Sequence, residues 1–126
     1  MTPEPGTRAK RVGESVRQEV ATLLATEVKD PRVAGAVVTR VEMTGDLRSA
    51  RVHVCLLEGG DSVVRRRALI GALGRASGLI RREITRRLGL RFAPELRFFY
   101  DDGADALTEV ERLLAEITAE RQSRKP

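Results

Sequence analysis

Arginine is the residue type whose abundance points most directly to a chemistry in this chain, and that chemistry is phosphate binding. Of the 23 basic residues, all but Lys10, Lys29 and Lys125 are arginine, and the net charge is +5. The planar guanidinium group donates paired hydrogen bonds to a phosphate, and a positive net charge favours a polyanionic partner. A coding bias toward arginine in an ordinary basic protein explains the same composition, so the positions of the arginines must decide.

The arginines concentrate in residues 65–100, where Glu83 and Glu95 are the only acidic residues. Helical spacing predicts that five of them lie on the outward sides or flanks of two consecutive helices: Arg67, Arg75, Arg81, Arg82 and Arg86. Such a run is either a phosphate-binding surface or a solvated helix face, and spacing alone leaves both interpretations open.

A kink is predicted between these two helices at Ala76-Ser77-Gly78, because Gly71 and Gly74 weaken the first helix by up to roughly 1 kcal/mol each. Ser77 and Gly78 would then open the second helix, where free backbone N–H groups and the positive end of the helix dipole favour a phosphate. A packing or turn glycine without a ligand explains Gly78 equally well. The candidate binding set is Arg67, Arg75, Ala76, Ser77, Gly78, Arg81, Arg82 and Arg86.

The first half of the chain is predicted to form a helix and a β-hairpin. The helix begins at Thr7 and ends at Asp30-Pro31, because the residue before a proline avoids the α region. Alternating β-branched residues then predict strands 36–43 and 48–57 around the turn Thr44-Gly45-Asp46. In the second strand, Arg51, His53 and Cys55 share the face opposite the apolar one.

The second half supplies the two helices around the kink, a third strand and a last helix. Asp61 or Ser62 caps the first of these helices, and Gly89 ends the second in the left-handed conformation. Residues 95–100 alternate as a strand, and a last helix carries an apolar stripe from Leu107 to Ile117. Residues 1–6 and 122–126 are predicted to be flexible, which leaves residues 7–121 as a single domain.

The four aromatic residues, Phe92, Phe98, Phe99 and Tyr100, are predicted to fill the core of a chain that is poor in aromatics. Stacking on RNA bases is the alternative, and Phe99 is the exception to follow because alternation places it opposite Phe98 and Tyr100. His53 and Cys55 are predicted to pack at or near the surface, since no third soft ligand completes a metal site.

Several functional classes are disfavoured by what the sequence lacks. Cys55 has no second cysteine to pair with, which fits a reducing compartment. No stretch resembles a signal peptide, and no apolar run is long enough to span a bilayer, so a cytoplasmic protein without membrane contact is expected. We find no nucleophile with a base and no glycine-rich phosphate loop, so no enzymatic activity and no cofactor are expected.

This order of elements resembles a type II KH domain, helix–strand–strand–helix–kink–helix–strand, with an additional C-terminal helix. No GXXG sequence stands at the kink between the two central helices, where KH domains use one to clamp nucleotides. Ala76-Ser77-Gly78 stands there, and the GXXG spacing of Gly71 and Gly74 lies within the preceding helix. That tripeptide is similar to the Ala-x-Gly kink of ribosome-binding factor A, a family of bacterial small-subunit assembly factors. The resemblance covers almost the whole folded chain, including these segments: Asp30-Pro31-Arg32-Val33, Gly45-Asp46-Leu47, Pro94-Glu95-Leu96 and Tyr100-Asp101. Thr44-Gly45 departs from the serine-proline type of turn expected in this family.

The resemblance implies an α+β fold with a three-stranded sheet and a role in ribosome assembly. It implies binding to 16S ribosomal RNA and to the free, immature 30S subunit near its decoding region, help with late small-subunit assembly and 16S rRNA maturation, and support of growth in the cold. A monomer is expected. A protein-interaction adaptor of the same fold, without direct RNA binding, is the alternative.

Overall fold

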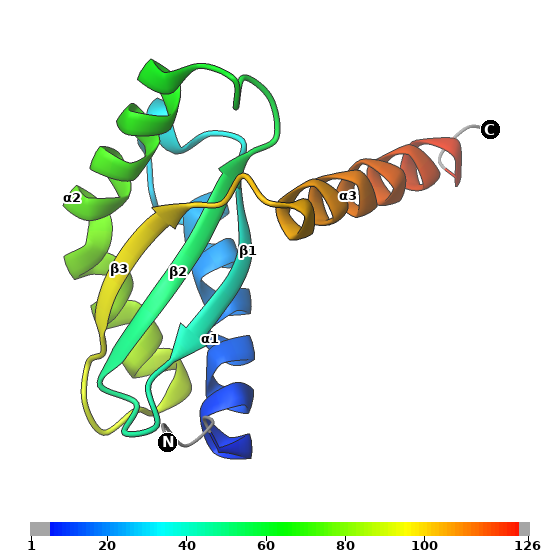
Figure 1. The fold of residues 1–126 in the computed structure, drawn as a ribbon. Helices are drawn as coiled ribbons and strands as arrows, with labels where there is room; N and C mark the ends of the chain where they lie inside the picture. Colours follow the sequence, from blue (N-terminus) through cyan, green and yellow to red (C-terminus); the bar gives the residue numbers. More distant parts are fainter. Residues whose placement is uncertain (1–5, 124–126) are drawn as a thin grey trace.

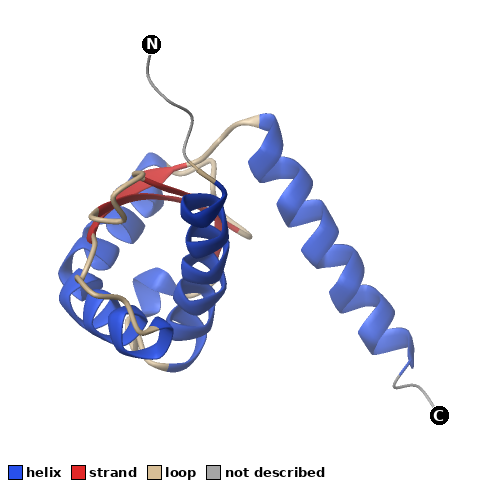
Figure 2. Cartoon of the chain, turned by 90° about the horizontal axis from the view of Figure 1, so that it is seen from below, coloured by secondary structure: helices blue, strands red, loops and turns tan. Residues whose placement is uncertain are grey.

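The structure, a computed structural model, describes residues 6–123 except for the side chains of residues 104 and 105. Within that part of the chain, the elements follow in this order: α1 (Thr7–Thr26), the 3₁₀ turn η1 (Pro31–Val33), β1 (Ala36–Met43), β2 (Ser49–Leu56), α2 (Val63–Leu88), β3 (Glu95–Tyr100) and α3 (Ala104–Ser123). Helices α1 and α2 cover one face of the sheet, whereas α3 projects away from the other elements (Figure 1; Figure 2).

The sheet has β2 in its centre, paired antiparallel with β1 and parallel with β3. The tight β1–β2 turn is held by Asp46, whose Oδ1 accepts a hydrogen bond from the backbone N–H of Arg48 at 3.1 Å. Leu47 adopts a positive φ of 62° in the same turn. This topology, with two helices on one face of a mixed three-stranded sheet, confirms the α+β, KH-like fold that the order of elements predicts.

The core lies between the inner face of the sheet and the two helices. Val16, Val20 and Leu23 of α1 are fully buried, and they meet Val52 and Val54 of β2 in one continuous apolar cluster. Helix α2 adds four fully buried side chains to that cluster: Leu69, Leu73, Ile80 and Ile84. Because burying one such side chain stabilises a fold by roughly 1.5–3 kcal/mol, this interior is the main source of stability.

The predicted division into two helices at Ala76-Ser77-Gly78 is wrong, because α2 is one α-helix of 26 residues, which bends along its length in Figure 1. The reason is the spacing of the buried apolar residues along the helix. Leu73 and Ile80 are seven residues apart, a spacing that returns to the same side of an α-helix within roughly 20°. One continuous helix therefore buries both side chains, and the packing of its apolar side outweighs the low helix propensity of the glycines.

Ser77 and Gly78 consequently lie inside a helix and do not begin one. The hydroxyl of Ser77 donates a hydrogen bond to the carbonyl oxygen of Gly74 at 2.7 Å, a contact that bends a helix without breaking it. The predicted phosphate site at a helix N-terminus in this place is therefore wrong. The helix begins at Val63 after the capping residue Ser62 and ends at Gly89 in the left-handed conformation, as predicted.

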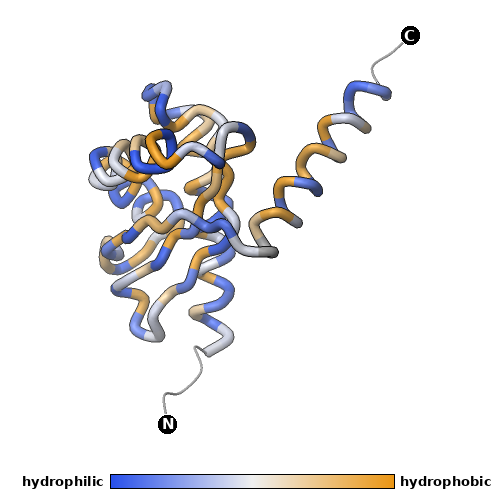
Figure 3. Tube along the Cα trace, turned by 45° about the horizontal axis from the view of Figure 1, so that its top comes forward, coloured by the Kyte–Doolittle hydropathy of each residue, from blue (hydrophilic) through white to orange (hydrophobic). Residues whose placement is uncertain are grey.

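Helix α3 packs on the rest of the chain through its first half. Ala106, Val110 and Leu113 pack against Val37 and Cys55, whereas Leu107 is 61% exposed and the stripe beyond it faces solvent. Apolar segments continue along this projecting helix in Figure 3. The helix ends at Ser123, so Gln122 and Ser123 are helical and not part of a tail; the expectations for residues 1–5 and 124–126 lie outside the described residues.

The aromatic residues divide between the core and the surface. Phe98 and Tyr100 pack against the core cluster, as predicted. Phe92 is 47% exposed, so its assignment to the core is wrong. It follows the end of α2 in a loop, where the guanidinium groups of Arg48 and Arg91 lie over its ring at 4.5 and 5.5 Å.

The two glycines at positions 13 and 78 provide a test of the packing and of the continuity of α2. A Cβ atom at Gly13 would lie 3.1 Å from the carbonyl oxygen of Val41, whereas one at Gly78 would meet no atom within 4 Å. We expect Gly13→Ala to lower the free energy of unfolding by roughly 1 kcal/mol, and Gly78→Ala to raise it by roughly 0.5–1 kcal/mol. Urea unfolding followed by circular dichroism measures both, and a destabilised Gly78→Ala variant would contradict an unbroken helix.

Cys55 reports the docking of α3. Burial, followed by the nearby carboxylates of Asp101 and Glu109, raises the pKa of its thiol to about 11. Because the thiolate is the reactive form, alkylation by iodoacetamide at pH 8 should be roughly a hundredfold slower than for a thiol with the ordinary pKa of 9.0. Ala106→Asp places a charge in the closed contact with Cys55 and should accelerate alkylation strongly. Ala119→Asp, on an exposed part of the same helix, should not, and equal rates for the two variants would show that α3 does not protect the thiol.

Candidate nucleic-acid interface

The outward side of α2 carries a row of arginines, which we call the α2 arginine stripe: Arg67, Arg75, Arg82 and Arg86. All four side chains are exposed, on the side opposite the buried Leu69, Leu73, Ile80 and Ile84. At 1.5 Å per residue the stripe extends for roughly 28 Å along the helix axis. Gly78 lies in the same row, and no side chain covers it.

Three members of this stripe are available to a ligand. Within the described residues, no hydrogen bond or ion pair engages the guanidinium groups of Arg67, Arg75 and Arg82. Arg86 is different, since it donates a hydrogen bond to the Glu83 carboxylate at 2.7 Å. That hydrogen bond is the main cause of the lowered pKa of Glu83 and of the raised pKa of Arg86. A phosphate would have to compete with Glu83 for Arg86 but not for the other three.

Arg81 has a structural connection that its position in the sequence does not reveal. Its Nε donates to the carbonyl oxygen of Pro94 at 2.8 Å, and its Nη2 donates to that of Ala93 at 3.2 Å. Pro94 is fully buried beside the start of β3. The side chain thus holds the loop between α2 and β3 against the helix, and the stripe does not include it.

The remaining predicted residues face the interior or the side of the helix. Ala76 is partly buried and packs against the core cluster, and Ser77 is half-buried with its hydroxyl bonded to Gly74. The structure therefore brings Arg67, Arg75, Gly78, Arg82 and Arg86 together on one side of α2. It places Ala76, Ser77 and Arg81 away from that side.

Sequence reasoning did not anticipate the cross-links that Arg87 makes. Its guanidinium group lies 3.4 Å from the carboxylates of both Glu19 and Glu83, and 3.9 Å from that of Glu27. It therefore connects the end of α2 to α1 and is not a free cation. The signal for this role in the sequence is the helical spacing of Arg87, which places it at the flank of the apolar stripe Ile80, Ile84 and Leu88.

Neither a metal site nor a membrane segment is found in the described part of the chain. No group of three or more potential His, Cys, Asp or Glu ligands occurs among residues 6–123. Within the same range, no helix combines the length and the apolar character required to cross a bilayer. The single histidine is engaged by a carboxylate, with His53 Nε2 at 2.7 Å from Glu42 Oε1.

Comparison with known proteins identifies the family. The family model of ribosome-binding factor A matches residues 8–114, which include the sheet, α1, α2 and the docked part of α3. The chain belongs to the ribosome-binding factor A family. The ribosome-binding factor A of Sorangium cellulosum is 50% identical over 110 residues, which cover 87% of this chain and 88% of that protein. The ribosome-binding factor A of Syntrophobacter fumaroxidans is 41% identical over 110 residues, which cover 87% of this chain and 93% of that protein.

Solved structures of the family share the fold. The crystal structure of ribosome-binding factor A from Thermus thermophilus superposes with a TM-score of 0.63 at 21% identity, covering 73% of this chain and 94% of that one. The solution structure of a Thermotoga maritima protein assigned to the same family superposes with a TM-score of 0.65 at 29% identity. That match covers 81% of this chain and 94% of the other. The family membership confirmed here is the one that the sequence resemblance predicted.

The neighbouring residues Arg81 and Arg82 separate a structural arginine from an exposed one. Arg81→Ala removes two charge-assisted hydrogen bonds to the loop before β3 and should lower the free energy of unfolding by roughly 1–3 kcal/mol. Arg82→Ala removes only an exposed charge and should change it by less than about 0.5 kcal/mol. Chemical denaturation of the two variants measures the difference, and equal stabilities would show that the hydrogen bonds of Arg81 contribute nothing.

Proposed function

We propose that this protein associates with the immature 30S ribosomal subunit and assists late small-subunit assembly and 16S rRNA maturation. Membership of the ribosome-binding factor A family supports the proposal. The observation that carries it is the α2 arginine stripe, in which Arg67, Arg75 and Arg82 are exposed and form no hydrogen bond or ion pair with a carboxylate within the described residues; the charge of Asp30 reaches Arg75 only through space. Guanidinium groups that are held apart from carboxylates are free to bind phosphates.

The stripe contacts the RNA backbone in this proposal and does not read bases. Contacts of this kind neutralise phosphates and release counterions, so they provide affinity and orientation without sequence specificity. Gly78 leaves the middle of the stripe without a side chain, which allows a phosphate backbone to approach the helix closely between Arg75 and Arg82. The protein acts there as a cytoplasmic monomer.

We further propose that the protein acts by binding alone and catalyses no reaction. The state of its two most reactive residue types supports this. The thiol of Cys55 is buried beneath α3, with its pKa raised to about 11 mainly by desolvation, so it is protonated at neutral pH. The imidazole ring of His53 lies on a sheet face beside the Glu42 carboxylate, and no hydroxyl or thiol in the described structure is bonded to the ring; the Thr39 hydroxyl donates only to the backbone carbonyl oxygen of His53. Turnover of precursor 16S rRNA by the purified protein with Mg²⁺ would contradict this part of the proposal.

A protein-interaction adaptor is the second candidate, and the exposed side of α3 favours it. Leu107, Leu114 and Ile117 are exposed there, and apolar patches of this kind are typical of protein contacts. The dependence of binding on salt separates the two functions. Phosphate binding gives a steep linear fall of log K with log salt concentration, whereas an apolar protein interface does not.

The decisive variant removes two of the unpaired arginines, Arg75→Ala together with Arg82→Ala. Affinity for immature 30S subunits should fall, and the slope of log K against log salt should become shallower by up to about two, roughly one for each phosphate that is no longer neutralised. The fold should be retained, because exposed charges contribute little to stability.

The matched control is the double variant Arg112→Ala and Arg121→Ala, which removes the same charge from exposed positions on α3. Its salt slope should equal that of the parent protein. If the control reduced affinity as much as the α2 variant, the arginines would act only through the net charge, and the assignment of the stripe would be wrong.

A further inference from the structure

The sheet has a face that no helix covers over most of its length. Helices α1 and α2 lie on the opposite side (Figure 2), and α3 covers only the end of this face, near Val37 and Cys55. We call the remainder the open sheet face. Strand alternation and register place these residues on it: Arg40, Glu42, Arg51, His53, Arg97 and Phe99.

Phe99 is the one large apolar side chain exposed on the open sheet face among the described residues, at 41% of its surface. In the register of the sheet it lies directly opposite His53, and the two rings stack with centroids 5.7 Å apart and planes inclined by 28°. Phe98 and Tyr100, its neighbours on β3, point to the core instead. The face thus presents one supported aromatic ring to solvent, which is an area suited to a single planar ligand.

Two arginines lie beside this ring without a shared counter-charge. Arg51 and Arg97 are direct partners across β2 and β3, and like charges in that position destabilise a sheet unless an anion lies between them. Glu42 is the partner of Arg51 on the other side, but its carboxylate turns to His53, 2.7 Å away. Within the described residues Arg51 has no ion pair, and Arg97 has only a 3.6 Å contact with Glu95.

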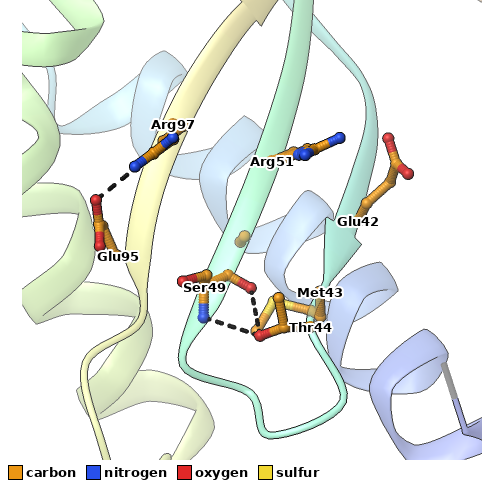
Figure 4. A pocket seen from close by; sticks show the side chains of 8 residues that line it. Glu42, Met43, Thr44, Ser49, Arg51, Glu95 and Arg97 are labelled. Atoms are coloured by element: carbon orange, nitrogen blue, oxygen red, sulfur yellow. Dashed lines mark hydrogen bonds and ion pairs between the residues drawn. The ribbon is translucent and has the colours of Figure 1, made fainter. Parts of the chain in front are cut away.

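A hollow of about 330 Å³ adjoins the two arginines, next to the β1–β2 turn. Figure 4 shows Arg51, Arg97 and Glu42 around it, with Thr44 and Ser49 hydrogen-bonded to each other at its lower end. Its volume is at the small end of the roughly 300–1,000 Å³ range of ligand pockets. Six of its eight lining residues are polar or charged, among them the two arginines and the carboxylates of Glu42 and Glu95. The hydroxyl groups of a sugar can bond to these carboxylates while the phosphate contacts the arginines.

We propose that the open sheet face binds single-stranded RNA, with an unpaired base stacked on Phe99 and an adjacent phosphate held between Arg51 and Arg97. One aromatic ring flanked by cations matches a base and its phosphate, because stacking is tolerant of sequence and the backbone requires positive charge. A protein partner would require a larger apolar area than one ring supplies. The inference rests on RNA being the ligand of this protein, but it uses a surface separate from the α2 arginine stripe.

The chain contains no tryptophan, so Phe99→Trp introduces a single fluorescent reporter at the proposed stacking position. Titration with a uridine decanucleotide should quench its emission to saturation. An abasic decamer with the same phosphates should not, because it offers no base to stack. Leu114→Trp is the matched control, since Leu114 is similarly exposed, at 45%, but lies on α3, outside the open sheet face; its emission should change little.

Two further variants measure how much the aromatic ring and the two arginines each contribute to the affinity for RNA. Phe99→Ala should weaken binding of the uridine decanucleotide by roughly 5- to 150-fold, the range expected when one base no longer stacks. Arg51→Ala with Arg97→Ala should weaken binding and make the salt slope shallower by up to about 1.4, roughly 0.7 for each single-strand phosphate contact. Equal quenching by the abasic decamer, no quenching by the uridine decamer, or parental affinity of Phe99→Ala would each overturn the inference.

The same reporter distinguishes failure of this inference from failure of the proposed function. Adding Arg75→Ala and Arg82→Ala to Phe99→Trp should leave the quenching by the uridine decamer intact, because those arginines lie on the other side of the core. If subunit binding did not respond to the removal of Arg75 and Arg82 while quenching persisted, only the assignment of the α2 stripe would fail. If subunit binding did respond but no quenching occurred, only the open sheet face would be wrong.

Discussion

The packing of the apolar side of α2 against the inner face of the sheet is the contact on which the rest of the structure depends. Leu69, Leu73, Ile80 and Ile84 are fully buried in it, and a helix buried along one side is fixed in its rotation about its own axis. Residues half a turn away must then face solvent. The contact that forms the core thereby determines where the arginines of α2 are presented, and a shift of one residue would rotate the whole stripe by roughly 100°.

In the sheet, the alternation of side chains along β2 likewise determines which residues face solvent. Val52 and Val54 are directed into the core, so Arg51 and His53, which alternate with them along the strand, must face the other way. The helices α1 and α2 occupy only the inner face, and α3 covers only the end of the outer face. The domain consequently has two exposed, arginine-bearing surfaces on opposite sides of one core, one along α2 and one across the strands.

These two surfaces meet only at the edge of the sheet. Strand β3 is an edge strand that pairs with β2, and the loop that precedes it is held to α2 by Arg81 through the carbonyl groups of Ala93 and Pro94. The hydrogen bonds of Arg81 therefore help to set the position of β3 relative to α2. The distance between the two surfaces depends on that position. An arginine can determine in this way where two surfaces lie without being part of either.

By itself the sequence determined the strands, the first and last helices, a cap at Asp61 or Ser62, the left-handed Gly89 and the family. These depend on spacing and chemistry within a few residues or on the order of segments along the chain. It also identified the arginines of α2, but not which of them are free. Only the tertiary structure decided that α2 continues through Ser77 and Gly78, that Arg81 is bound to Pro94, that Phe92 is exposed and that α3 projects from the domain. The physical reason is that each of these outcomes depends on a partner from a distant segment, or on the lack of one, and local periodicity carries no information about such partners.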